Sequence, residues 1–151
     1  MGSFEESYVR EQPSVFRAAF LLAGERDLAE DATQEAFARA LERWRRLRDQ
    51  RWAGGWVMTT ALNVVRRSVR RRRPVAVRST ETYDLPERDL DLWREVRALP
   101  KRQQEAVVLH YVGDLSVTDC AAVMGCDEGT VKTHLYRARH DLNQRLGGER
   151  V

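Results

Sequence analysis

The chain has 151 residues, of which 42% are hydrophobic and 32% charged, and this length suits one ordinary domain or two small ones. The apolar fraction is too high for a wholly disordered chain, and no run of about 18 apolar residues could span a membrane. The acidic N-terminus lacks the apolar stretch of a signal peptide, so we expect a cytoplasmic protein without membrane insertion. The net charge of +3 does not by itself indicate nucleic-acid binding.

Three helical patterns run through residues 1–73. Their apolar residues recur every three or four positions, and Gly24, the pair Gly54 and Gly55, and Pro74 interrupt them. We therefore expect helices at about 7–23, 28–47 and 56–72, with a loop at 48–55 that ends in the two glycines.

The second of these helices is expected to have two different faces. Its apolar face is predicted to hold Phe37, Ala40, Leu41 and Trp44, of which we assign Phe37 and Trp44 to the core. Its polar face is predicted to hold Asp31, Gln34 and Glu35. Arg39 is placed to pair with Glu35 one turn earlier. The polar face is either a solvated surface or a docking site for a basic partner helix.

Residues 74–90 divide the chain in two. They begin with Pro74, hold a second proline together with Ser, Thr and acidic residues, and show no apolar stripe. We expect a flexible linker here, between domains at 1–73 and 91–151. Because a linker of this size reaches at most about 60 Å when extended, the two domains could act on separate sites.

The last part of the chain also has the helical period. Four short helices are expected, at about 91–99, 101–111, 116–124 and 128–146. No strand-like alternation is long enough to support a sheet. The predicted class is all-α, with a three-helix domain followed by a four-helix domain.

The segment LSVTDCAAVMGCDEGTVKTHLYRAR, residues 115–139, predicts a helix-turn-helix. Ser116 and Asp127 are suited to cap its two helices, and Gly125 permits the positive φ of a short turn. Apolar residues of the second helix at Val131, Leu135, Ala138 and Leu142 leave an outward face of Lys132, Thr133, Tyr136 and Arg137. Such a face reads base edges in the major groove, whereas the alternative is an ordinary hairpin with a solvated face.

Several segments resemble extracytoplasmic-function (ECF) sigma factors. Residues 115–142 resemble region 4.2, which reads DNA, in the run GTVK at 129–132 and in RAR at 137–139. Three further segments are similar to region 4.1 (LPKRQQEAVVLHYVGDLS, 99–116), region 2.2 (AEDATQEAFARALERW, 29–44) and region 2.4 (WVMTTALNVVRRSVRRRR, 56–73). The resemblance covers nearly the whole chain in the family's order and implies a minimal sigma factor of regions 2 and 4.

The resemblance implies two partners, core RNA polymerase and promoter DNA. The polymerase would be bound at its β′ clamp helices and its β flap, with Asp31, Gln34 and Glu35 facing the clamp helices. The −35 element would be contacted by Thr130, Lys132, Thr133, His134, Tyr136 and Arg137. The −10 element would be contacted by Trp52, Trp56, Asn63, Arg66, Arg67 and Arg70. An anti-sigma factor is a further partner that the family commonly has.

Some of these residues have structural alternatives. Trp56 also suits a core position at a helix start, Asn63 a structural hydrogen bond, and the run Arg70–Arg73 a basic helix end that complements the helix dipole. Arg102 and Arg139 are additional candidates for phosphate contact. Arg139 could instead cap the C-terminal half of its own helix.

No arrangement typical of an active site occurs in the sequence. The three histidines, His110, His134 and His140, have no Cys or carboxylate at metal-ligand spacing. Cys120 and Cys126 fit a core position and a turn position, with a redox switch as the alternative. We therefore expect no catalytic activity, no cofactor and no metal site.

Two other classes of protein compete with the sigma factor interpretation. A stand-alone helix-turn-helix regulator would bind a palindromic duplex tightly, as a dimer and without polymerase. It would leave the Asp31–Glu35 face and the helix around Asn63 unexplained. A nucleic-acid-modifying enzyme with a helical DNA-binding tail would require a metal or cofactor.

Overall fold

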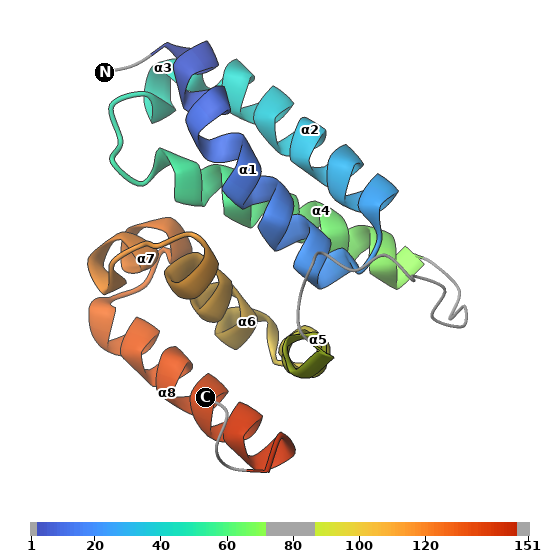
Figure 1. The fold of residues 1–151 in the computed structure, drawn as a ribbon. Coiled ribbons are helices and arrows are strands. Elements are labelled where there is room, and N and C mark those ends of the chain that lie inside the picture. The colour runs from blue at the N-terminus through green and yellow to red at the C-terminus, as the bar shows by residue number, and fades with distance from the viewer. Residues whose placement is uncertain (1–2, 72–86, 148–151) are drawn as a thin grey trace.

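The computed structural model describes residues 3–71 and 87–147, and these residues form helices and no strand (Figure 1). The predicted all-α class is therefore confirmed. Of the helices in these two ranges, none has the length and apolar character needed to span a membrane. The predicted linker lies outside the described residues except for its last four positions, which are helical.

The first half consists of three long helices and one short helix: α1 (Phe4–Ala23), α2 (Arg26–Glu42), α3 (Trp44–Leu47) and α4 (Ala53–Arg71). The amide of Glu6 donates to the Ser3 hydroxyl at 3.1 Å at the start of α1, and Gly24 ends that helix at φ 70°. Fully buried alanines such as Ala18, Ala32 and Ala61 separate α1, α2 and α4. Their small side chains allow the three helix axes to approach closely.

Two expectations for this half are wrong in detail. The helix expected at 28–47 is divided at Arg43 into α2 and α3, and α4 begins at Ala53, inside the expected loop. Gly54 and Gly55 lie in the first turn of α4. A Cβ on Gly54 would lie 2.5 Å from Glu11 Oε2, and one on Gly55 would lie 2.5 Å from Leu115 Cδ2. Close tertiary approach to Leu115, and not a turn, therefore explains Gly55, whereas Gly54 meets only the end of a flexible side chain.

The second half contains α5 (Glu87–Arg97), α6 (Lys101–Val107), the π-helical turn η1 (Val108–Val112), α7 (Val117–Met124) and α8 (Glu128–Arg145). The α5 helix begins four residues before the expected domain boundary. The predicted caps are confirmed. Asp119 N donates to Ser116 Oγ at 3.1 Å, Thr130 N donates to Asp127 Oδ1 at 2.7 Å, and Gly125 has φ 70°.

The two halves share one hydrophobic core. The α4 helix packs against α7 and η1, and α1 packs against α5 and η1. In Figure 1, α8 lies beyond α6 and α7, on the side of the molecule opposite α1 and α2. This arrangement leaves one face of α8 open and places part of α4 in an internal interface.

Candidate nucleic-acid and protein interfaces

The outward face of α8 is built as the periodicity predicted. All four residues of its apolar stripe are buried, at Val131, Leu135, Ala138 and Leu142. The predicted reading residues are all exposed, at Lys132, Thr133, Tyr136 and Arg137. Tyr136 is 66% exposed, an unusual position for a large aromatic ring in a folded chain. The face therefore combines a cation, a hydroxyl, an aromatic ring and a guanidinium.

The residues at the edges of this face differ in their surroundings. Thr130 is exposed at the start of α8, whereas His134 is half-buried. Burial lowers the pKa of His134, and the positive charges of Arg102 and Arg137 lower it further, against an opposing effect of Glu105. His134 is therefore largely neutral at pH 7 in the free chain.

Two further arginines of this half have structural partners. Arg102 Nη1 donates to Glu105 at 2.9 Å, and its Nη2 donates to the carbonyl of Met124, at the end of α7. Arg139 Nη1 donates to the Tyr111 hydroxyl at 2.8 Å, a tertiary contact rather than a cap on its own helix. Tyr111 is exposed beside α8, and the sequence pattern gave no signal for this contact.

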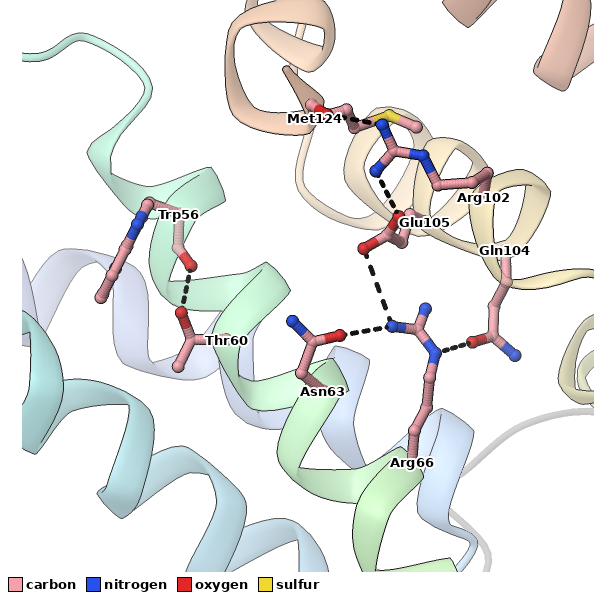
Figure 2. Close-up of polar contacts among 8 residues, drawn as sticks. All are labelled: Trp56, Thr60, Asn63, Arg66, Arg102, Gln104, Glu105 and Met124. Carbon is pink, nitrogen blue, oxygen red and sulfur yellow. Dashed lines mark hydrogen bonds and ion pairs between the residues drawn. The ribbon is translucent and has the colours of Figure 1, made fainter. Parts of the chain in front are cut away.

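Two of the predicted −10 residues on α4, Asn63 and Arg66, are engaged inside the molecule. Arg66 Nη1 donates to Asn63 Oδ1 at 2.9 Å, and Arg66 Nε donates to Gln104 Oε1 on α6 at 2.8 Å (Figure 2). The same guanidinium lies 3.7 Å from Glu105 Oε2. Asn63 thus makes the structural hydrogen bond that was its alternative role, and Arg66 connects the two halves of the chain.

The other predicted −10 residues have different surroundings. Trp52 and Trp56 are half-buried against the core, and the Arg43 guanidinium lies 5.8 Å from the centre of the Trp56 ring. Arg67 Nη2 is 3.3 Å from Glu35 Oε2. Arg70 is exposed at the end of α4, and the last two arginines of the run lie outside the described residues.

The polar face of α2 is only partly free. Asp31 and Gln34 are exposed. Glu35 pairs with Arg39, as the i+4 spacing predicted, and also with Arg67 of α4. Leu41, which was predicted on the apolar face of this helix, is 56% exposed and lies two turns after Gln34. An open depression of about 510 Å³ is lined by residues 41–46 at this end of the helix.

The two cysteines are free thiols. Cys120 is buried in the core of the second half as predicted, and Cys126 is half-buried in the turn. Burial raises the pKa of Cys120 to about 11, and the neighbouring Asp119 carboxylate contributes to the increase. Cys120 is therefore protonated at neutral pH, and protonated thiols are poor nucleophiles.

Comparison with known proteins identifies the family. A family model described as "Sigma-70 region 2" matches residues 8–75, and one described as "Sigma-70, region 4" matches residues 89–142. The ECF RNA polymerase sigma factor EcfG of Rhodopseudomonas palustris is 30% identical over 154 residues, covering 95% of this chain and 85% of the relative. The chain belongs to the ECF RNA polymerase sigma factors. As a sigma factor it is a transcription initiation factor, and a stand-alone regulator is not favoured.

Two further comparisons concern a second relative and the fold. The ECF sigma factor BldN of Streptomyces coelicolor is 33% identical over 159 residues, and the match covers 95% of this sigma factor but 60% of BldN. The co-crystal structure of the sigma factor RpoE with the anti-sigma factor NepR from Bartonella quintana has a TM-score of 0.74 at 24% identity. That match covers 97% of this chain and 98% of RpoE, and it shows that the two share a fold. Below, region 2 denotes α1–α4 and region 4 denotes α5–α8.

Proposed function

We propose that this sigma factor binds core RNA polymerase through the exposed face of α2, reads the −35 element with α8 and captures the −10 element with α4. The observation that carries the proposal is the α8 face. A capped helix buries four apolar residues and leaves four reading residues exposed side by side. This is the geometry with which the second helix of a helix-turn-helix enters the major groove.

Chemistry supports the assignment of each residue on α8. The Arg137 guanidinium can donate two parallel hydrogen bonds to the O6 and N7 atoms of guanine, and Lys132 can donate to the same atoms. Thr133 donates its hydroxyl hydrogen to the carbonyl of Gly129 at 3.0 Å, and this bond holds its side chain in one orientation. Thr130 is exposed in the first turn beside this face, and we assign it to a phosphate at the edge of the contact.

The α4 face suits the −10 element for a different reason. A strand separated from its partner exposes base faces and a charged backbone, and binding it requires aromatic surfaces and cations. Trp52 and Trp56 precede or begin α4, and Arg66, Arg67 and Arg70 follow along it. We assign the two tryptophans to bases and the three arginines to phosphates.

Polymerase binding is assigned to α2. Asp31 and Gln34 are exposed, and Leu41 extends the same face with an apolar side chain at the depression of residues 41–46. An exposed apolar side chain next to polar residues is a composition that protein interfaces use. We further propose that the chain has no catalytic activity of its own and works in the cytoplasm with the polymerase. An anti-sigma factor stays a prediction.

Run-off transcription tests the proposal. The template is a promoter selected by the reconstituted holoenzyme, and initiation is measured with core polymerase alone, with wild-type chain and with Asp31→Arg. We expect transcripts that require the chain and that Asp31→Arg reduces at least tenfold, because a reversed charge in an interface costs several kcal/mol. The matched control is Glu30→Arg, an exposed residue of the same helix about 100° away.

Tight binding of a palindromic duplex without any effect on polymerase would contradict the sigma activity. An equal loss in Asp31→Arg and Glu30→Arg would contradict the assignment of the α2 face.

A further inference from the structure

A pair of polar side chains lies beside the outward face of α8. Arg139 Nη1 donates to the Tyr111 hydroxyl at 2.8 Å, and Tyr111 is 53% exposed. Arg139 comes from α8 and Tyr111 from η1, so two elements of region 4 contribute to the pair. A guanidinium and a phenol hydroxyl both donate hydrogen bonds. The pair is therefore a candidate site for an anion.

Arg139 lies at the edge of the outward face of α8. It follows Lys132 by seven residues, which is about two helical turns, so the two side chains leave the helix in nearly the same direction. Arg139 is also about 10 Å further along the helix axis. The second helix of a helix-turn-helix contacts base edges with its N-terminal residues, and the major groove is only about 12 Å wide. We therefore expect an arginine two turns later to meet the phosphates at the border of the groove.

The charge of Arg139 is not neutralised by an acidic side chain. Arg66 and Arg145 each pair with a glutamate. Arg139 makes no ion pair among the described residues, and its partner is a neutral hydroxyl. Tyr111 accepts this hydrogen bond and donates none to a described residue, so its O–H hydrogen is available to a further acceptor. The pair thus places a full positive charge next to an O–H donor.

The π-helical turn η1 explains why Tyr111 reaches α8. In a continuous α-helix, Tyr111 would follow Val107 and Val108 by four and three residues and would share their buried side. The wider turn, closed by a bond from Gly113 N to Val108 O at 3.0 Å, leaves Tyr111 exposed instead. A Cβ on Gly113 would lie 2.8 Å from the carbonyl oxygen of Leu109, so the turn requires glycine there. Turns of this kind are frequent at functional sites.

His110 fixes the orientation of the tyrosine ring. The two rings meet edge to face, with centroids 4.8 Å apart and an angle of 76° between their planes. His110 Nδ1 lies 2.8 Å from the carbonyl oxygen of Leu115. Because a carbonyl oxygen only accepts, Nδ1 carries the hydrogen of this bond. The imidazole is thereby held in place, and Tyr111 is positioned before a ligand binds, which lowers the entropy cost of binding.

We propose that Arg139 and Tyr111 together bind one phosphate of the −35 element, at the border of the bases that α8 reads. The proposal rests on the proposed function of α8 and adds a residue of η1 to it. Arg139 supplies the charge and the charge-assisted hydrogen bonds. Tyr111 positions the guanidinium and donates its O–H hydrogen to the same phosphate. Such a contact carries no base preference and strengthens binding to every duplex equally.

The salt dependence of duplex binding tests the proposal. The full chain is titrated into labelled −35 duplexes from the selected promoter, with each base pair varied, between about 50 and 200 mM salt. Arg139→Gln should weaken binding to all duplexes about tenfold. It should also make the slope of log affinity against log salt shallower by about 0.9, the value for one phosphate contact.

Two further variants control for this substitution. Arg139→Lys keeps the charge, so it should keep the wild-type slope. Arg145→Gln removes a cation from the same helix, and Arg145 follows Tyr136 by nine residues and therefore lies on the opposite side of α8. We expect Arg145→Gln to leave both the affinity and the slope unchanged.

Tyr111→Phe tests the hydroxyl separately. The variant keeps the ring that packs on His110, so we expect binding to fall about threefold for all duplexes with an unchanged slope, because no charge is lost. Combined with Arg139→Gln, it should weaken binding by less than the product of the two single effects, since both groups serve one phosphate. The matched control is Tyr8→Phe, which removes the hydroxyl of an exposed tyrosine in region 2.

The outcomes separate this proposal from the function of α8. An unchanged slope in Arg139→Gln, or a loss confined to one base pair, would overturn the phosphate contact. Equal binding by Tyr111→Phe and Tyr8→Phe would overturn the role of Tyr111. Loss of transcription with unchanged duplex binding would assign the pair to an acidic surface of the polymerase, against the proposal. The proposed function of α8 fails separately, if Arg137→Ala changes neither the affinity nor the base preference.

Discussion

The two helices assigned to promoter DNA, α8 and α4, present their polar residues in different ways. On α8, Lys132 and Arg137 are exposed, and the helix packs on α5, α6 and α7 through its opposite side. On α4, Arg66 is held by Glu105 of region 4 and Arg67 by Glu35 of α2. The outward side of α8 exposes the residues that its periodicity predicts. The polar residues Arg66 and Arg67 of α4 are already paired with other parts of the chain.

The difference follows from the position of each helix in the fold. The α8 helix lies at the outside of region 4, whereas α4 lies between α1 and α2 on one side and region 4 on the other (Figure 1). A helix covered on two sides can keep arginines in its interface only if carboxylates or carbonyls accept from them. An arginine that we assign to DNA therefore also connects region 2 to region 4.

The largest effects on stability are expected on the buried sides of α4 and α8, where the two helices are alike. Leu62 of α4 and Leu135 of α8 are 0% and 3% exposed. Truncation of either to alanine would lower the free energy of unfolding by about 2–5 kcal/mol, through lost transfer energy and the cavity left behind. Urea denaturation followed by circular dichroism measures the change.

Leu41→Ala is the matched control for these truncations, because Leu41 is 56% exposed. Its effect on stability should stay within about 0.5 kcal/mol, as for most surface substitutions. A loss from Leu41→Ala as large as that from Leu62→Ala would contradict its exposed position on α2.

A smaller effect is expected at the open face of α8. Arg137→Ala would weaken binding of the −35 duplex by about 1–3 kcal/mol and relax the preference for one base pair, if Arg137 contacts guanine with both donors. Titrations of duplexes with each base pair at each position measure both changes. Arg94→Ala, which removes an exposed arginine from α5, is the control.

Because α8 faces away from region 2, the Arg137→Ala loss should be the same in the wild-type chain and in one whose contact between the regions is weakened by Arg66→Ala (Figure 1). A loss that depends on Arg66 would mean that region 2 influences α8. A uniform loss across all duplexes would reassign Arg137 from base reading to phosphate contact.

The comparison of α8 with α4 also shows what the sequence could predict. The caps at Ser116 and Asp127 and the stripe that contains Val131 depend on residues within one or two helical turns, and all were predicted correctly. Local patterns carry such features because each turn of a helix repeats the same geometry.

Features that depend on distant residues were missed or misread. Gly54 and Gly55 indicated a turn, but both lie in the first turn of α4, and the small size of Gly55 serves the approach of Leu115. Leu41 fitted the apolar pattern of α2, but it lies near the end of the helix, where its side chain is exposed. Arg66 and Glu105 are far apart in the chain, and no local pattern indicates that they meet.

The smallest effect is expected at the cap that fixes the start of α8. Hydrogen bonds from the backbone amide and the side chain of Thr130 hold the pKa of Asp127 below its ordinary value. A carboxyl whose pKa is lower in the folded state stabilises the fold at neutral pH. This contribution declines as the pH falls below about 3.9, the ordinary value for Asp, and is gone below the depressed pKa of the folded state.

Asp127→Asn removes the charge but keeps a residue that caps helices about equally well. Wild type should therefore have the higher melting temperature at pH 7, and the difference between the two chains should shrink as the pH is lowered toward 3. Thermal unfolding of both chains between pH 7 and pH 3 measures this difference in melting temperature. All other titrating groups are the same in the two chains, so their effects cancel. A difference in melting temperature that stays constant with pH would mean that the carboxylate charge does not stabilise the start of α8. The stability of this cap would then depend only on the shape of the side chain, unlike the charged Arg66–Glu105 contact of α4.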